Sequence, residues 1–107
     1  MIIGGKERPF RFCLNALKEF SRQENLSMEE AFGSLNKLNL DQTINLIYLC
    51  FKWGAKKENQ EVDFTADDVA DWLEDDLGQF KDIGELMISQ MSKIAESKNQ
   101  PAPQRGA

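Results

Sequence analysis

The apolar residues of this chain recur with the spacing of α-helices, and polar residues mark where the helices begin and end. The first stripe has members at positions i, i+3, i+4 and i+7, namely Cys13, Ala16, Leu17 and Phe20. These residues share one helix face, and the helix is expected to end at Asn25. Ser27 with Glu30 then has the form of a capping box, which predicts a second, short helix to about Lys37.

The segment from Leu40 to Trp53 is apolar on nearly every side and lacks an internal breaker. A helix without a polar face has to be surrounded by other elements, so we expect this one at the centre of the fold. Asn39 or Asp41 can cap its start, and Gly54 is expected to close its end in the left-handed conformation. The β-branched and aromatic residues in its middle would also suit a strand, but the length favours a helix.

Beyond a polar surface loop, a second capping box opens the acidic part of the chain. Thr65 is the expected N-cap, with Asp68 at the box position. Phe64 precedes this cap and can pack against the first turn as a hydrophobic staple. The helix is expected to stop at Gly78 and to bury one stripe, made of Val69, Trp72, Leu73 and Leu77.

A last helix is expected to start near Asp82, with one apolar side made of Ile83, Leu86, Met87, Met91 and Ile94. The Pro-rich end over residues 99–107 is expected to be disordered. With 107 residues the chain can bury about two thirds of its unfolded surface, which suits one small domain. The pattern therefore predicts a single all-α domain over residues 1–98, with about five helices.

Charge is distributed unevenly along the chain, although the net charge is only −5. Residues 1–57 carry nine Lys and Arg against six Asp and Glu. Residues 58–85 carry one basic residue against eleven acidic ones, and residues 86–107 carry three against one. Such segregation can steer association with a basic partner or with the basic part of a second copy, or it can simply keep an acidic helix face solvated.

Few residues of this chain suit catalysis or metal binding. It has no histidine, and Cys13 and Cys50 lack CxxC spacing, so two buried free thiols are expected in place of a disulfide or a zinc site. Carboxylates crowd one predicted helix without the loop pattern that calcium needs: Asp67, Asp68, Asp71, Glu74, Asp75 and Asp76. Because no nucleophile or phosphate-binding loop accompanies them, we expect no enzyme activity, no metal and no cofactor.

Membrane and nucleic-acid binding are not expected either. No run approaches the ~20 apolar residues that span a bilayer. Lys6, Arg8 and Arg11 form only a small basic cluster without a recognition helix, in a chain whose pI is ≈ 4.7. These observations predict a soluble, cytosolic protein.

Four short segments follow one another at the start of the chain: Ile2–Ile3, residues 4–7, residues 9–12 and then Leu14-Asn15-Ala16-Leu17. Their order resembles that of phage tail assembly chaperones of the siphophage type. In that family a short apolar strand, a turn and a second short strand run directly into a helix. The acidic segment from Asp63 to Leu73 resembles a later helix of the family, so the likeness covers roughly residues 2–95. It implies a short N-terminal β-hairpin, with strands at Ile2–Ile3 and at residues 9–12, ahead of the helices.

The resemblance also implies a function. A protein of this family is the short form made upstream of the tape measure protein, which it binds and keeps soluble while the tail tube protein assembles around it. It acts in the host cytoplasm, is absent from the mature virion, and is often accompanied by a longer frameshifted form of itself. It is not catalytic.

The candidate partner-binding residues fall into an apolar and an acidic set. Ile83, Met87 and Met91 could cover a helical client, because thioether side chains repack against varied partners, although ordinary core packing explains them too. Asp67, Asp71 and Asp75 could meet the basic half of a second copy in a homo-oligomer. The alternative function is an acidic inhibitor or decoy that occupies a nucleic-acid-binding protein, and the basic first half of the chain argues against it.

Overall fold

The order of the elements follows the predicted caps closely. The computed structural model describes residues 1–98, and within them lie a two-stranded hairpin, five α-helices and one short 3-10 helix. The prediction of a mainly helical fold, with about five helices and an N-terminal hairpin, is thereby confirmed. Residues 99–107, for which the sequence predicts disorder, lie outside the described residues.

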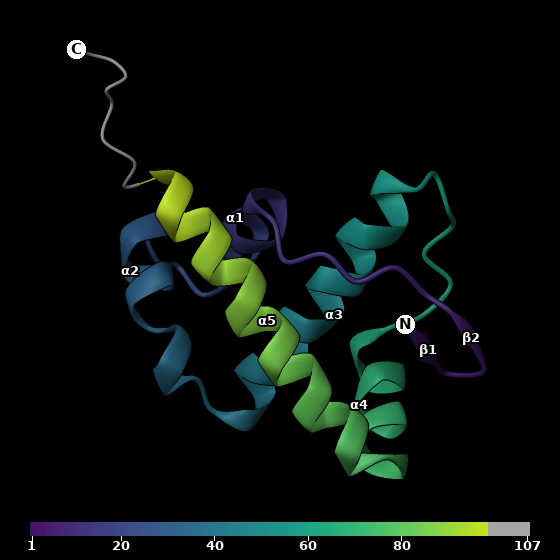
Figure 1. Ribbon diagram of the computed structural model, residues 1–107. Coiled ribbons are helices and arrows are strands. Elements are labelled where there is room, and N and C mark those ends of the chain that lie inside the picture. Colours follow the sequence, from purple (N-terminus) through teal and green to yellow (C-terminus); the bar gives the residue numbers. More distant parts are fainter. Residues whose placement is uncertain (99–107) are drawn as a thin grey trace.

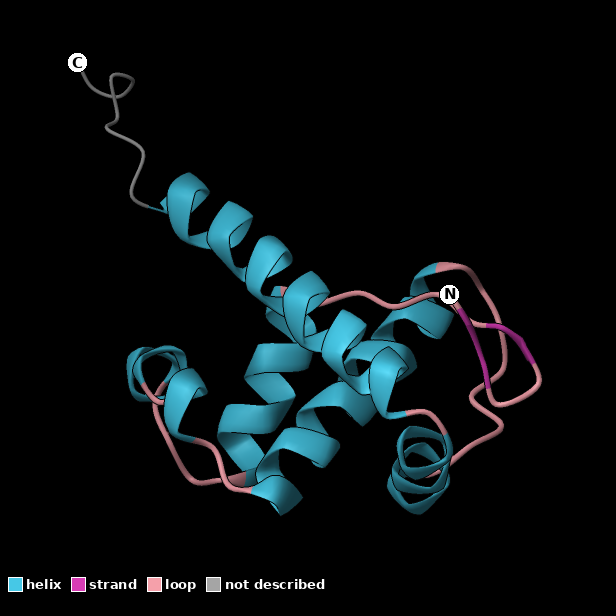
Figure 2. Cartoon of the chain, turned by 60° about the horizontal axis from the view of Figure 1, so that its bottom comes forward, coloured by secondary structure: helices cyan, strands magenta, loops and turns pink. Residues whose placement is uncertain are grey.

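Helix α3 lies in the middle of the fold, as its apolar sequence predicts. The elements are β1 Ile2–Ile3, β2 Lys6–Glu7, α1 Leu14–Gln23, α2 Met28–Gly33, η1 Leu35–Lys37, α3 Leu40–Lys57, α4 Ala66–Asp75 and α5 Leu77–Lys98. Helices α1 and α4 both pack against α3, and α2 packs against α1. Figure 1 shows α5 crossing over α3, from α4 at one end of the molecule toward α1 and α2 at the other. The same crossing is visible from a second direction in Figure 2.

Three of the helices, α2, α3 and α4, begin with a capping box. Ser27 Oγ accepts a hydrogen bond from the amide of Glu30 at 3.0 Å, and Thr65 Oγ1 accepts one from the amide of Asp68 at 3.2 Å. In both boxes the side chain of the acidic residue accepts a hydrogen bond from the amide of the capping residue. Of the two predicted caps for α3, the structure uses Asn39, whose Oδ1 accepts from Gln42 at 2.8 Å. Each box satisfies amide groups that the first turn of a helix leaves without a partner.

The first helix is terminated at Asn25 as predicted, whereas the second ends earlier than predicted. Helix α1 ends at Gln23, and Asn25 beyond it takes a φ of 58°. The second helix does not continue to Lys37: α2 ends at Gly33, and a separate 3-10 turn follows.

The prediction that Gly54 closes the central helix is wrong. Helix α3 continues to Lys57, and Gly54 is a buried residue within it. The reason for a glycine here is tertiary, since a Cβ atom would lie 2.3 Å from the carbonyl oxygen of Pro9. The left-handed residue after this helix is Asn59, with a φ of 58°.

The prediction that Gly78 stops the acidic helix is also wrong. Helix α4 ends at Asp75, and α5 begins at Leu77 rather than near Asp82. Asp76 forms the junction, because its Oδ1 accepts from the amide of Gln79 at 3.1 Å at the start of α5. Leu77, which was expected to be buried, is 69% exposed.

The second strand of the hairpin is Lys6–Glu7, and not residues 9–12 as the family resemblance implies. Ile2 pairs with Glu7 and Ile3 with Lys6, around a turn in which Gly4 and Gly5 have φ values of 63° and 86°. The ladder stops before Pro9, which has no amide hydrogen to donate.

Residues 9–12 instead form an extended segment, called the strap below, between α3 and α5. The amide of Arg11 donates to the carbonyl of Cys50 on α3 at 3.0 Å. The amide of Phe12 donates to Oε1 of Gln90 on α5 at 2.6 Å. The strap therefore connects the two longest helices, α3 and α5.

The core has two connected clusters on either side of α3. The first lies between α1, α2 and α3 and includes Leu17, Phe20, Leu46, Leu49 and Cys50. The second lies between the hairpin, α3, α4 and α5 and includes Ile3, Phe51, Val69, Leu73 and Ile83. Met87 contacts both clusters, so α5 closes the core that α3 divides.

The hairpin is held against α4 by Arg8, whose side chain is only 10% exposed. Its guanidinium lies 4.4 Å from the ring centre of Trp72 and 5.1 Å from that of Phe64. Nη1 pairs with Oδ1 of Asp63 at 2.9 Å, while Lys6 pairs with the other oxygen of that carboxylate at 2.9 Å. Hydrogen bonds from Lys6 and Arg8 lower the pKa of Asp63 to about 2.

Replacing Gly54 with alanine should destabilise the protein by about 1–3 kcal/mol, because the strap has to move away from α3. Gly84 is the matched control within a helix, since nothing lies within 4 Å of a Cβ built there. Gly84→Ala should stabilise the protein by about 0.5–1 kcal/mol. Chemical denaturation measures both, and equal effects would show that the strap does not press on α3.

Asp63→Asn should remove part of the acid sensitivity of folding. A carboxylate whose pKa is lowered on folding stabilises the protein above its unfolded pKa, near 3.8, and that contribution is lost as the pH falls toward 2. The urea midpoint of the unchanged protein should therefore fall more steeply between about pH 4 and pH 2 than that of the variant. Parallel curves would contradict the pairing with Lys6 and Arg8.

Candidate functional site

A groove of about 980 Å³ lies beside the strap. It is bordered by the C-terminal halves of α3 and α5, the start of α1, and Met28 of α2. Its lining residues are Arg11, Phe12, Cys13, Leu14, Asn15, Met28, Trp53, Lys56, Lys57, Lys93 and Ile94. We call this site the basic groove.

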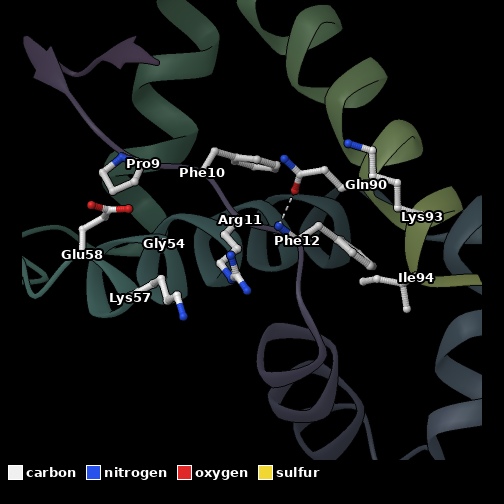
Figure 3. Close-up of a pocket in the computed structure, with 10 residues that line it drawn as sticks. All are labelled: Pro9, Phe10, Arg11, Phe12, Gly54, Lys57, Glu58, Gln90, Lys93 and Ile94. Atoms are coloured by element: carbon white, nitrogen blue, oxygen red, sulfur yellow. Dashed lines mark hydrogen bonds between the residues drawn. The ribbon is translucent and has the colours of Figure 1, made fainter. Parts of the chain in front are cut away.

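A smaller hollow of about 300 Å³ lies next to the basic groove and shares Arg11, Phe12, Lys57, Lys93 and Ile94 with it. Figure 3 shows this hollow, with the strap passing between Gly54 and Lys57 of α3 and Gln90 and Lys93 of α5. The bond from the Phe12 amide to Gln90 closes one side of it. Strap residues Arg11 and Phe12 line both hollows.

Apolar side chains line much of the basic groove, and cations surround them. Leu14 is 57% exposed, although it is the first residue of a helix with a strongly buried opposite face. Met28, Trp53 and Ile94 are half-buried. Arg11, Lys56, Lys57 and Lys93 carry four positive charges, and none of the lining residues is a carboxylate.

Trp53 has a fixed orientation in the groove wall. Its indole Nε1 donates to Oε1 of Glu19 at 2.8 Å, and Lys52 pairs with the other oxygen of Glu19 at 2.7 Å. Burial raises the pKa of Glu19, but the hydrogen bonds from Lys52 and Trp53 outweigh it, and the pKa lies below its usual range. Glu19 stays ionised near neutral pH, and Lys56 lies 5.1 Å from the indole ring centre.

The two cysteines lie on and behind this groove as free thiols. Cys13 is half-buried on the groove, whereas Cys50 is buried beneath the strap. Burial raises the pKa of the Cys50 thiol well above its usual value, so it remains protonated and behaves as a small apolar core residue.

The structure separates the two predicted sets of partner-binding residues. Ile83 is fully buried in the second core cluster, and Met87 and Met91 are half-buried against the core. Asp67, Asp71 and Asp75 are exposed on α4. The side of α5 that was predicted to bind a client therefore faces mostly inward, and it does not adjoin the three exposed aspartates of α4.

Sequence reasoning missed the basic groove. Its residues come from three separate helices, with Leu14 on α1, Trp53 and the pair Lys56–Lys57 at the end of α3, and Ile94 on α5. Two signals were present: Leu14 falls outside the buried stripe of α1, and two consecutive lysines end an otherwise apolar helix. Neither signal shows that these residues meet.

Within residues 1–98, no helix is long and apolar enough to cross a membrane. The described residues also hold no group of three or more cysteine and carboxylate side chains that could bind a metal ion. The groove can attract anions through its cations and can take up apolar surface between Leu14, Trp53 and Ile94. These are the properties of a binding site for an anionic, partly apolar segment.

A scan against protein-family models, a search of curated proteins and a search of solved structures find no match to this chain. The class of protein is accordingly defined by the structure itself. It is a small helical domain with an N-terminal hairpin and a basic, apolar groove.

The groove should bind the anionic dye 1-anilinonaphthalene-8-sulfonate in the native state, because it offers apolar walls within a positive field. Leu14→Asp should abolish most of the increase in dye fluorescence. Leu40→Asp is a close control, since Leu40 is 62% exposed, begins α3 and is absent from the groove lining. The two variants carry the same charge, so equal dye binding would contradict this description of the groove.

Proposed function

We propose that this protein is a tail assembly chaperone of a phage, which binds the tape measure protein and keeps it soluble while the tail tube protein assembles. The likeness of residues 2–95 to that family motivates the proposal. The basic groove supports it, because the groove offers a binding surface for a client.

The groove suits a helical client better than a small compact ligand. Its volume of about 980 Å³ is at the upper end of the range for small-molecule sites, and it is partly open to solvent. An amphipathic helix binds such a groove through apolar residues on one face. The cations at its edge would favour a segment with carboxylates beside those apolar residues.

The rest of the proposal follows from the family resemblance. The protein acts without catalysis in the host cytoplasm, is absent from the mature virion, and works beside a longer frameshifted form of itself. Its direct partner is the tape measure protein, and the tail tube protein replaces it as the tube forms.

Co-expression with the tape measure protein tests this proposal. The tape measure should be soluble with the unchanged protein and with Leu40→Asp, and it should precipitate with Leu14→Asp. Circular dichroism and thermal melts of both variants establish that they fold equally well. A client that stays soluble with both variants would move its binding site away from the groove, and one that precipitates with the unchanged protein would overturn the function.

A second candidate function, an acidic decoy, is favoured by one observation. Asp67, Asp71 and Asp75 form an exposed row on α4, and none of them belongs to an ion pair among the described residues. Replacing all three with asparagine should leave client solubility unchanged if the protein is a chaperone. A loss of inhibition of a nucleic-acid-binding protein by that variant would favour the decoy instead.

A further inference from the structure

The junction of α4 and α5 presents charges opposite to those of the basic groove. Five exposed carboxylates follow α4 toward this junction, from Asp67 in the first turn of the helix through Asp71 to Glu74, Asp75 and Asp76 at its end. Next to them is Leu77, which is 69% exposed. We call these six residues the acidic corner. It combines an exposed apolar side chain with surrounding anions, whereas the groove combines an apolar lining with surrounding cations.

The charges of both surfaces have no ion-pair partners among residues 1–94, whose side chains the structure describes. The ion pairs there are Met1–Glu7, Lys6–Asp63, Arg8–Asp63 and Lys52–Glu19. None involves a carboxylate of the corner or a cation of the groove. Unpaired like charges gathered at one place repel each other, so a surface of opposite sign would relieve both sets.

The two surfaces cannot meet within one molecule. Leu77 starts α5 and Ile94 lies on its C-terminal half, seventeen residues further along. At about 1.5 Å per residue, a straight helix separates them by roughly 25 Å. Figures 1 and 2 both show α4 at one end of the molecule, with the C-terminal half of α5 directed toward the other. This separation exceeds the Debye length of about 8 Å at physiological salt.

We infer that the basic groove of one copy docks the acidic corner of a second copy. In this contact Leu77 enters the apolar part of the groove, near Leu14 and Ile94. The carboxylates of α4 then lie close to the ammonium groups of Lys56 and Lys57. Because both partners are defined on the same chain, the charge complementarity needs no other molecule.

Such a contact joins two different surfaces, so it is heterologous. A bound pair keeps one free groove and one free corner, and further copies add head to tail into open chains or closed rings. The proposed client uses the same groove, so client and second copy compete for it. The docking itself occurs without a client and is measured on the purified protein, so its failure leaves the proposed chaperone function standing.

Sedimentation velocity at low salt tests the contact with paired charge reversals. The sedimentation coefficient of the unchanged protein should rise with concentration in 50 mM salt, and this rise should largely disappear at 500 mM, where exposed pairs are screened. Lys56→Glu with Lys57→Glu, and separately Asp71→Lys with Asp75→Lys, should remain monomeric in 50 mM salt.

Two controls change the net charge by the same amounts at exposed positions outside both surfaces. Arg22→Glu with Lys37→Glu, and Glu29→Lys with Asp41→Lys, should associate as the unchanged protein does. Circular dichroism confirms that each variant is folded.

Mixing the two defective variants distinguishes head-to-tail docking from other self-association. The variant with Lys56→Glu and Lys57→Glu keeps its acidic corner, and the variant with Asp71→Lys and Asp75→Lys keeps its groove. An equimolar mixture should therefore associate in 50 mM salt, although neither variant does so alone. A strictly monomeric unchanged protein would overturn the inference. Association that both reversals leave intact, or a mixture that stays monomeric, would do the same.

Discussion

The packing of the Arg8 side chain positions the whole N-terminal segment. Its guanidinium lies over Trp72 and Phe64 and donates to the carbonyls of Ile3 and Gly4, at 3.0 and 3.3 Å. The same group pairs with Asp63. A buried cation is tolerated only when its N–H groups have acceptors and its charge is compensated. Here two carbonyls and a carboxylate accept the hydrogen bonds, and two aromatic rings stabilise the charge. One side chain thereby joins the hairpin, the loop before α4, and α4 itself.

The groove depends on that arrangement because the strap follows Arg8 directly in the chain. Once Arg8 is held against α4, residues 9–12 have to cross α3, and they can do so closely only at Gly54. The strap then supplies Arg11 and Phe12 to the groove and, through Gln90, holds the C-terminal half of α5 beside it. A contact of the hairpin therefore shapes the binding surface to which the strap leads.

The uneven charge of the sequence becomes a separation in space. The acidic corner lies at the α4–α5 junction, and the lysines that end α3 lie beside the groove near the far end of α5. Both surfaces include exposed apolar side chains, Leu77 at the corner and Leu14 at the groove. This arrangement connects the two proposals, because a segment that binds the groove should resemble the corner in combining carboxylates with apolar residues.

Local sequence determined the elements of this protein and the position of most helix starts. Ser27, Asn39 and Thr65 cap helices because each bonds an amide only three residues away, and such contacts can be read from spacing alone. The central position of α3 was equally predictable, since a helix without a polar face has to be covered on all sides.

Tertiary structure decided the role of Gly54, the position of the second strand and the set of residues that form the groove. Gly54 has the same identity as a helix-ending glycine, but its role depends on Pro9, which lies 45 residues away in the chain. Likewise, Leu14, Lys57 and Ile94 form one groove only because the strap brings three helices together. Spacing along a chain reports contacts within a few residues, and a surface assembled from distant segments exists only after the chain has folded.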